Sequence, residues 1–266
     1  MPQKEKIQQM FDSIAPGYDA FNHLTSLGAD RAWRRRALRE VVGPRVLDEA
    51  CGTGDFTIAI ANYLGKTGRK TVENVEGPFR NPGPSTDGIS VVGVDISEGM
   101  LEVMHRKVEA AGLSDAAAGR GTTVHAETGD CCALQFPDAS FDTVTAAFGV
   151  RNFEDREKAL QEVLRVLRPG GRFVMLELGI PRNPIIRAAY KFYFTRIMPL
   201  VGAGISKDKA AYRYLPASVL NFPKPQDWMA TMQKAGFAEV RHRPLSLGIC
   251  NLFTGVRPST QEYPQA

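Results

Sequence analysis

A glycine turn between a strand-like run and a helix-like run is the strongest chemical signal in this sequence of 266 residues. It lies in VLDEACGTGDFTIAIA, residues 46–61, where an apolar run breaks at Gly52 and Gly54 and resumes as an alanine-rich amphipathic run. Glycines at such a turn let a ligand approach the backbone closely. They match the first two glycines of the dinucleotide fingerprint GxGxxG, but Thr57 stands at the third position. The turn therefore predicts a ligand site with an incomplete dinucleotide signature.

An acid directly after the turn narrows the class of ligand. Asp55 opens the predicted helix, where backbone N–H groups and the positive end of the helix dipole would otherwise attract a pyrophosphate. A carboxylate at that place repels a phosphate, whereas the ammonium and sulfonium groups of S-adenosylmethionine tolerate it. The simpler interpretation is that Asp55 only caps the helix and that the glycines only turn the chain.

Two further acids follow the next two strand-like runs. Asp95 ends the second run, where a carboxylate can accept both hydroxyl groups of a ribose. Asp130 ends the third run, where it can accept from an adenine amino group while the N–H of Cys131 donates to the ring. Asp95 follows Gly54 by 41 residues instead of the usual gap of about 20, and an insertion at 66–88 explains the excess. Each acid alone is also a common turn residue, but acids at three successive strand ends favour a nucleoside site.

The elements that must position these residues alternate between strand-like and helix-like periods. The strand-like runs are 45–50, 89–96, 122–130, 141–150, 171–179, 239–245 and 248–256. The clearest helix-like run is 154–171, which has an apolar face and ends in Pro-Gly-Gly. Strands separated by helices predict an α/β fold with a doubly wound, mostly parallel seven-stranded sheet. The last two runs are joined too tightly for a crossover helix, so they predict an antiparallel C-terminal hairpin.

Composition and charge exclude several classes of protein. Apolar residues make up 43% and charged residues 23% of the chain, as in a folded globular protein. A net charge of +4 is too small to indicate a nucleic-acid partner. The four cysteines form neither a CxxC zinc pattern nor a disulfide framework, and the four histidines lack metal-ligand spacing. We therefore expect a cytoplasmic protein with no bound metal, no secretory signal and no membrane-spanning segment.

Several longer motifs resemble one enzyme family. VLDEACGTGD, VVGVDIS, GDCCALQFPDASFDTVT and EVLRVLRPGGRFVMLE are similar to the successive motifs of class I S-adenosylmethionine-dependent methyltransferases. YDAFNHLTSLGADRAWRR, FGVRNFEDREKAL and AYRYLPASV resemble the ubiquinone/menaquinone biosynthesis C-methyltransferases, the UbiE/MenG group, and the likeness runs from about Gln9 to Arg257. The resemblance implies S-adenosylmethionine as the cofactor. It implies cofactor contacts from Thr53, Asp95, Asp130 and Cys131, and the glycine turn adds Gly52 and Gly54 to the expected cofactor site.

The resemblance also implies a division of the chain into parts. We expect an N-terminal helical lid over residues 1–44, a methyltransferase domain over 45–258 and a tail over 259–266. Within the domain, the stretch 66–88 is rich in Gly, Pro and charge and predicts a flexible surface insertion. The segment 181–213 is expected to be a helical insertion on the substrate side.

The acceptor that this family implies is a prenylated quinol, whose ring carbon becomes nucleophilic when a neighbouring hydroxyl loses its proton. Arg151 and Asn152 follow the fourth strand-like run, and the Arg151 guanidinium would lower the pKa of that hydroxyl and stabilise its anion. Tyr18, in the lid, would hydrogen-bond the acceptor or a water molecule. The alternatives are a salt bridge from Arg151 to Glu154 or Asp155, and a Tyr18 that only packs the lid.

The chain departs from the family pattern at five positions. Ala50 stands where many methyltransferase turns have a glycine, a replacement that is tolerated if φ stays negative. Phe21, Asp30 and Gly179 stand where the family usually has methionine, histidine and serine, and Ala147 stands where some relatives have serine. None of these changes removes a candidate catalytic group, so they concern the outline of the acceptor pocket.

The segment 181–213 carries seven Arg or Lys residues against one acid, interleaved with apolar side chains. Such a basic amphipathic segment could rest on the surface of a membrane, which holds a lipid-tailed substrate. A helix packed on the domain is the alternative.

The expected activity is methylation of demethylmenaquinol to menaquinol by an S-adenosylmethionine-dependent C-methyltransferase. One alternative is another acceptor, either a ubiquinone-type benzoquinol or another lipid-like molecule. The other is a non-catalytic module that binds S-adenosylmethionine. The expected location is cytoplasmic, at the inner face of the membrane if 181–213 makes contact.

Overall fold

The computed structural model describes residues 4–67, 88–114, 121–198 and 209–259, without the side chains of 209–213. In this part of the chain the strands form a seven-stranded sheet in the order β3-β2-β1-β4-β5-β7-β6. The strands are β1 (Arg45–Glu49), β2 (Ile89–Asp95), β3 (Thr122–Thr128), β4 (Phe141–Ala147), β5 (Leu167–Leu178), β6 (Ala238–Leu245) and β7 (Cys250–Val256).

The pairing of the strands confirms the predicted sheet. β1 pairs in parallel with β2 and β4, and the parallel pairing continues to β3 on one side and β5 on the other. β7 is antiparallel to both β5 and β6, so the last two strands form the predicted antiparallel hairpin. The sequence order of the parallel strands reverses at β1, and ligands of such sheets bind beyond the carboxyl ends of the strands at that reversal.

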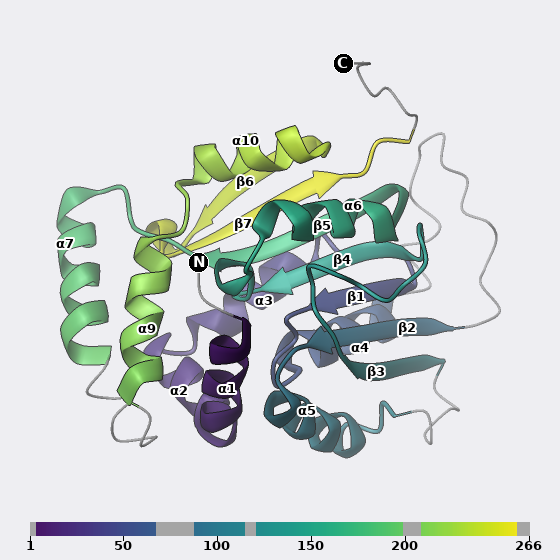
Figure 1. Cartoon of the computed structure of the whole chain (residues 1–266), viewed down its shortest axis with the longest axis horizontal. Coiled ribbons are helices and arrows are strands. Elements are labelled where there is room, and N and C mark those ends of the chain that lie inside the picture. The colour runs from purple at the N-terminus through teal and green to yellow at the C-terminus, as the bar shows by residue number, and fades with distance from the viewer. Residues whose placement is uncertain (1–3, 68–87, 115–120, 199–208, 260–266) are drawn as a thin grey trace.

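Helices cover both faces of the sheet and one of its ends (Figure 1). They are α1 (Lys4–Ile14), α2 (Tyr18–Thr25), α3 (Ala29–Leu38), α4 (Asp55–Thr67), α5 (Glu98–Ala110), α6 (Arg156–Val166), α7 (Pro184–Phe192), α9 (Lys209–Leu220) and α10 (Pro225–Ala235). Helices α3, α4 and α5 pack on one face, and α6 and α10 pack on the other. Helices α1, α2, α7 and α9 lie beyond the carboxyl ends of the parallel strands (Figure 1).

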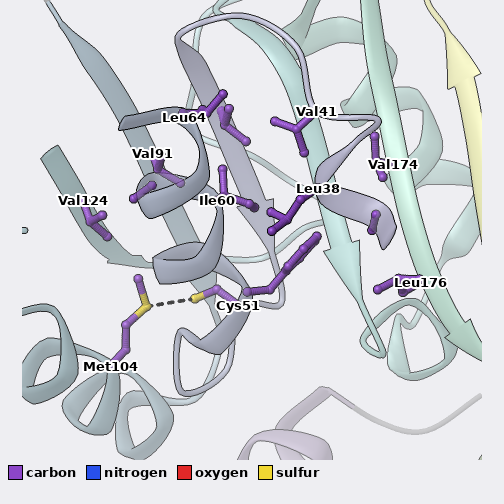
Figure 2. Close-up of a cluster of buried hydrophobic side chains, with 14 of the residues drawn as sticks. Leu38, Val41, Cys51, Ile60, Leu64, Val91, Met104, Val124, Val174 and Leu176 are labelled. Atoms are coloured by element: carbon purple, nitrogen blue, oxygen red, sulfur yellow. Dashed lines mark hydrogen bonds between the residues drawn. The ribbon is translucent and has the colours of Figure 1, made fainter. Parts of the chain in front are cut away.

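The hydrophobic core fills the space between the sheet and these helices. On one face, shown in Figure 2, side chains of α3, α4 and α5 meet apolar side chains of β2, β3 and β5. The labelled members are Leu38, Val41, Cys51, Ile60, Leu64, Val91, Met104, Val124, Val174 and Leu176. The Cys51 thiol lies 3.5 Å from the Met104 sulfur, which ties the glycine turn to α5. The core therefore holds the turn after β1 against the helix that follows β2.

Helix α6 was predicted with the right beginning and the wrong end. Asp155 caps it, and the Asp155 carboxylate accepts a hydrogen bond from the N–H of Lys158 at 2.9 Å. The helix ends at Val166 rather than at the predicted Pro-Gly-Gly, because a proline at 169 disfavours helical backbone at the residue before it. The backbone from Leu167 onwards belongs to β5 instead.

The predicted insertions lie partly outside the described residues. Helix α4 continues to Thr67, so the first two residues of the predicted insertion 66–88 are helical, and 68–87 lie outside the description. In 181–213, α7 is followed by a π-helical turn at Tyr193–Ile197, and 199–208 lie outside. Of the predicted tail, 260–266 lie outside as well. Within the described ranges no helix combines the length and the apolar character needed to cross a bilayer.

Candidate active site

The predicted glycine turn connects β1 to α4 and is tightly packed. Gly54 has a φ of +79°, and a Cβ at this position would lie 2.5 Å from the Met104 side chain. Ala50 has a φ of +49°, which contradicts the expectation that alanine is tolerated here because φ stays negative. The left-handed conformation costs a residue other than glycine about 1–2 kcal/mol. The Ala50 Cβ fits because Gly149 faces it, and a Cβ on Gly149 would lie 2.4 Å away.

A small cavity of about 70 Å³ lies beside this turn. Four of the six predicted cofactor residues line it: Gly52, Asp95, Asp130 and Cys131. The other two, Thr53 and Gly54, are not in its lining. Thr53 is buried, and its hydroxyl donates a hydrogen bond to Asp19 of α2. The structure thus brings two of the three predicted acids, Asp95 and Asp130, to one cavity and gives Thr53 a contact with the N-terminal helices instead.

Asp95, at the end of β2, is held by backbone groups on both of its oxygens. The N–H of Gly52 donates to Oδ2 at 2.8 Å, and the N–H of Ser97 donates to Oδ1 at 2.9 Å. Burial raises the pKa of Asp95, although these two N–H groups act in the opposite direction. Each oxygen keeps further lone pairs, so the fixed carboxylate can accept from two neighbouring hydroxyl groups.

Asp130 is engaged by the N-terminal helix. Lys4 Nζ of α1 lies 2.8 Å from Asp130 Oδ2, and the N–H of Cys132 donates to Oδ1 at 2.8 Å. Burial acts to raise the pKa of Asp130, but the hydrogen bonds from Lys4 and Cys132 outweigh it and hold that pKa below its usual range. Side chains of α1 therefore occupy one side of the cavity, which explains why it is smaller than the roughly 300–1,000 Å³ of ordinary ligand pockets.

Asp55 begins α4 as predicted but does not line the cavity. Its carboxylate pairs with Lys107 of α5, and its other oxygen lies 3.8 Å from Arg34 Nη1. The negative charge of Asp55 is thus matched inside the protein. This corrects the argument that Asp55 repels a phosphate at the site, and it leaves Asp95 and Asp130 as the two predicted acids that line the cavity.

Asp55 also belongs to a cluster with His23 and Asp30, whose nitrogen and oxygen atoms lie within 4.8 Å of one another. Both carboxylates already pair with cationic side chains, Asp30 with Arg34 and Asp55 with Lys107. This balance favours an ion-pair network over a bound metal ion. Spacing along the chain did not indicate the cluster, because α2, α3 and α4 bring it together only in the fold.

A second and larger cavity, of about 410 Å³, adjoins the first. Tyr18 and Phe148 line both cavities, so these two side chains mark where they meet. Its lining is largely apolar and includes Trp33, Ile186, Tyr193, Phe194, Met198, Leu215 and Ile249. Its charged lining residues are Asp30, Arg34 and Arg151. The site therefore has a polar compartment beside the glycine turn and an apolar compartment with a few charged groups.

Arg151 lies in the second cavity and is paired with an unforeseen partner. It is only 6% exposed, and its Nη1 lies 2.8 Å from Glu177 Oε1 on β5. Its own N–H donates to Glu177 Oε2 at 3.0 Å. The alternative of a salt bridge to Glu154 or Asp155 is therefore wrong. Among the described residues, Arg151 Nε is buried and has no hydrogen-bond partner.

The other two predicted catalytic residues lie close by. Burial raises the pKa of Tyr18, although the positive charges of Arg151 and Arg34 act against it. The Tyr18 ring also packs edge-on against Phe11 of α1, so both a ligand role and a packing role agree with its position. Asn152 lines the first cavity, and its Oδ1 accepts a hydrogen bond from the Tyr214 hydroxyl at 3.1 Å.

Sequence reasoning missed the roles of Lys4, Arg34, Asp30 and Glu177. Lys4 faces Asp130 across 126 positions of sequence, a distance at which no local pattern applies. Arg34 and Asp30 lie one helical turn apart on α3, and that i,i+4 spacing could have indicated their ion pair.

Comparison with known proteins shows the family of this chain. Residues 1–257 match the model of the ubiE/COQ5 methyltransferase family. The chain is 42% identical over 254 residues to the ubiquinone/menaquinone biosynthesis C-methyltransferase UbiE of Geobacter sulfurreducens, covering 94% of this chain and 88% of that protein. It is 42% identical over 252 residues to the demethylmenaquinone methyltransferase of Thermus thermophilus, covering 94% of this chain and all of that protein.

A solved structure supports the fold. A SAM-dependent methyltransferase from Thermotoga maritima has a TM-score of 0.58 at 18% identity, with 94% of this chain and 99% of that one covered. At this identity the likeness shows the arrangement of the sheet and helices and not the reaction. Together with the match over residues 1–257, it shows that this chain has the class I methyltransferase fold and belongs to the ubiE/COQ5 methyltransferase family.

Proposed function

We propose that this protein transfers a methyl group from S-adenosylmethionine to a ring carbon of a prenylated quinol, and that the quinol is demethylmenaquinol. The observation that carries the proposal is the meeting of an acid-lined cavity and a larger apolar cavity at Tyr18 and Phe148. A polar donor and an apolar acceptor can thus be held side by side. The name of the Thermus relative supports demethylmenaquinol as the acceptor.

The residues of the first cavity fit the cofactor. Asp95 keeps lone pairs for the two ribose hydroxyls, and Asp130 can accept from the adenine amino group when Lys4 withdraws. Bound S-adenosylmethionine supplies an electrophilic methyl group on a positively charged sulfur. Because side chains of α1 line this small cavity, we propose that cofactor binding moves α1 outward.

Arg151 is proposed to stabilise the anion that forms on the ring oxygen. Glu177 holds the guanidinium in one orientation and offsets part of its charge. The stabilisation therefore depends on the remaining positive charge of a guanidinium that lines the second cavity in a fixed position, as in other preorganised anion sites. Asn152 and Tyr18 are proposed to position the ring between the two cavities.

A benzoquinol of the ubiquinone type is the second candidate acceptor, because the name of the Geobacter relative covers both quinone classes. The shared requirement is a reduced ring with a hydroxyl beside the carbon that is methylated. The apolar lining of the second cavity suits the ring and the start of the prenyl chain in either case.

We also propose that the protein contacts the membrane near this cavity. Apolar side chains are exposed on segments that border it, with Leu27 at 86%, Ile185 at 78% and Leu247 at 72%. Helix α7 has no buried residue and carries basic side chains beside its apolar ones. Contact with a bilayer would cover these side chains and bring a lipid-tailed acceptor to the cavity.

The test is turnover of labelled S-adenosylmethionine with the reduced and the oxidised acceptor. We expect methylation of demethylmenaquinol and not of the quinone, because only the quinol has a hydroxyl that can ionise. Arg151→Met should lower kcat by about 10²–10³, with Arg151→Lys between it and the wild type, while calorimetry should show unchanged cofactor affinity. Arg39→Met, on an exposed site, serves as the control. Equal turnover of quinone and quinol would refute the proposed chemistry.

A further inference from the structure

We propose that Asp30 accepts the proton of the ring hydroxyl in the second cavity and that His23 conducts it to solvent. The proposal rests on the quinol methylation proposed above. The feature that points to it is the small number of side chains in the cavity lining that can accept a proton. Of the described residues that line the cavity, Asp30 is the only carboxylate, and no histidine or lysine lines it.

The other polar groups of the lining are poor proton acceptors. The phenols are those of Tyr18, Tyr190 and Tyr193. Burial raises the pKa of each of them, so they stay protonated at neutral pH. The guanidinium groups of Arg34 and Arg151 carry their protons at all ordinary pH values and have no acceptor site. A base for the ring hydroxyl must therefore be Asp30 or come from outside this lining.

The surroundings of Asp30 keep it ionised and fixed. It is 3% exposed, and its Oδ1 accepts from the Ser26 hydroxyl at 2.7 Å. Its Oδ2 pairs with Arg34 and lies 2.9 Å from His23 Nδ1. Burial acts to raise the pKa of Asp30, but the hydrogen bond from Ser26 and the charges of Arg34 and His23 outweigh it and lower that pKa. The carboxylate is thus ionised, and a proton that it accepts is readily passed on.

His23 supplies the outlet from the cavity. Its ring lies between Asp30 and the surface, with 26% of the side chain exposed, and its Nε2 lies 3.5 Å from Asp55 Oδ2. Asp55 is faced in turn by Arg34 and Lys107. An imidazole can take a proton at one ring nitrogen and release one from the other.

The protons and electrons of the step balance as follows. The O–H bond of the ring hydroxyl breaks, its proton goes to Asp30, and its electron pair delocalises to the neighbouring ring carbon. That carbon forms a bond to the methyl group, and the pair of the broken S–CH₃ bond stays on sulfur. The C–H bond at the methylated carbon then breaks, and that proton returns to the ring oxygen to restore the quinol. One proton per turnover remains on Asp30, and it leaves through His23.

The experiment compares Asp30→Asn with a matched variant in the full chain. Asn keeps the shape and the hydrogen-bond acceptor but cannot take the proton, so kcat should fall by about 10²–10⁴. Its rate should also rise with pH, about tenfold per unit, where the wild type is flat, because the hydroxyl must then ionise without help. His23→Gln should give a smaller loss and a larger solvent deuterium isotope effect. In Asp30→Ala, added formate should restore part of the rate, whereas chloride should not.

Glu40→Gln is the matched control, since Glu40 forms the same i,i+4 pair with Arg36 on the same segment but lies outside the cavity lining. Its kcat and pH profile should equal those of the wild type, and cofactor affinity by calorimetry should be unchanged in every variant. Wild-type turnover in Asp30→Asn, or a loss with an unchanged pH profile and no rescue by formate, would overturn the proposal. A wild-type protein that leaves the quinol unmethylated would instead overturn the proposed function.

Discussion

Glu49 is a buried acid whose surroundings do not compensate its carboxyl group. It ends β1 with 0% exposure, and neither carboxyl oxygen has a hydrogen-bond partner within the described ranges. Burial, with the nearby charges of Asp48 and Glu162, raises the pKa of Glu49 well above its ordinary value. The folded protein therefore holds Glu49 neutral at a pH where the unfolded chain ionises it.

This mismatch predicts a pH-dependent cost to stability. An acid whose pKa is raised in the folded state stabilises the fold fully only below its unfolded pKa, and that stability is lost as pH rises towards the folded pKa. Glu49→Gln removes the ionisation and should therefore raise the free energy of unfolding at pH 8. The gain should be smaller at pH 5, as measured by urea unfolding. Glu102→Gln, on the exposed side of α5, should change little at either pH. An equal gain at both pH values would contradict this explanation.

Single residues were predictable where the topology alone fixes their place. Asp95 and Asp130 come together because the carboxyl ends of parallel strands share one edge of the sheet, and the sequence showed both strand ends. The partner of Arg151 was not predictable in this way. Glu177 meets it because β5 lies beside β4, and the choice between Glu177 and the nearer acids depends on side-chain directions.

Helix α1 carries the clearest consequence at the scale of an element. Lys4, Ile7 and Phe11 line the first cavity. The Lys4 ammonium pairs with the Asp130 carboxylate, which is proposed to accept a hydrogen bond from the adenine amino group. The hydrogen bond to Asp130 raises the pKa of Lys4. The N-terminal helix is thus tied to Asp130 by an ion pair, which we propose that the cofactor displaces.

Removing that contact should ease cofactor binding. Because such partly exposed ion pairs are worth about 0.2–1 kcal/mol, Lys4→Met should speed the association of S-adenosylmethionine by roughly 1.5–5-fold, and added salt should affect that rate less than in the wild type. Stopped-flow fluorescence at two salt concentrations would measure both. Lys6→Met, on the exposed side of the same helix, is the control. Slower association in Lys4→Met would show that Lys4 assists the cofactor rather than competing with it.

Helices and strands were predicted best where the hydrophobic periodicity extended over many residues and the capping residues were clear. Helix α6 and the C-terminal hairpin followed from an apolar face and from a short connection. The conformation of Ala50 did not, because alanine rarely adopts a positive φ and the local sequence shows no reason for it. The reason lies in the neighbouring loop, where Gly149 leaves room for the Ala50 Cβ.

The whole molecule presents its two compartments to different surroundings. The glycine turn and its acids face α1, whereas the apolar cavity opens among α2, α3, α7 and the loop before β7. Two exposed leucines of these segments, Leu27 and Leu247, adopt φ values of +50° and +61°. A leucine gains nothing from exposure and loses about 1–2 kcal/mol in this conformation. We therefore propose that these two leucines have a function beside the cavity, and that this function is contact with a bilayer surface.

This explanation predicts opposite effects on stability and on membrane binding. Asparagine tolerates the left-handed conformation, so Leu27→Asn and Leu247→Asn should each raise the free energy of unfolding by about 1 kcal/mol. Each should also weaken sedimentation with vesicles of phosphatidylcholine and phosphatidylglycerol by about tenfold or more, since an inserted leucine contributes about 1.5–3 kcal/mol. Binding of the wild type should fall with added salt, because the basic side chains of α7 attract the anionic lipid.

Ala139→Asn, which relieves the same conformation outside the lining of both cavities, should gain stability without affecting vesicle binding. Vesicle binding that is absent in the wild type, or unchanged in both leucine variants, would refute the membrane contact and leave the two cavities as a site for an acceptor that arrives from solution.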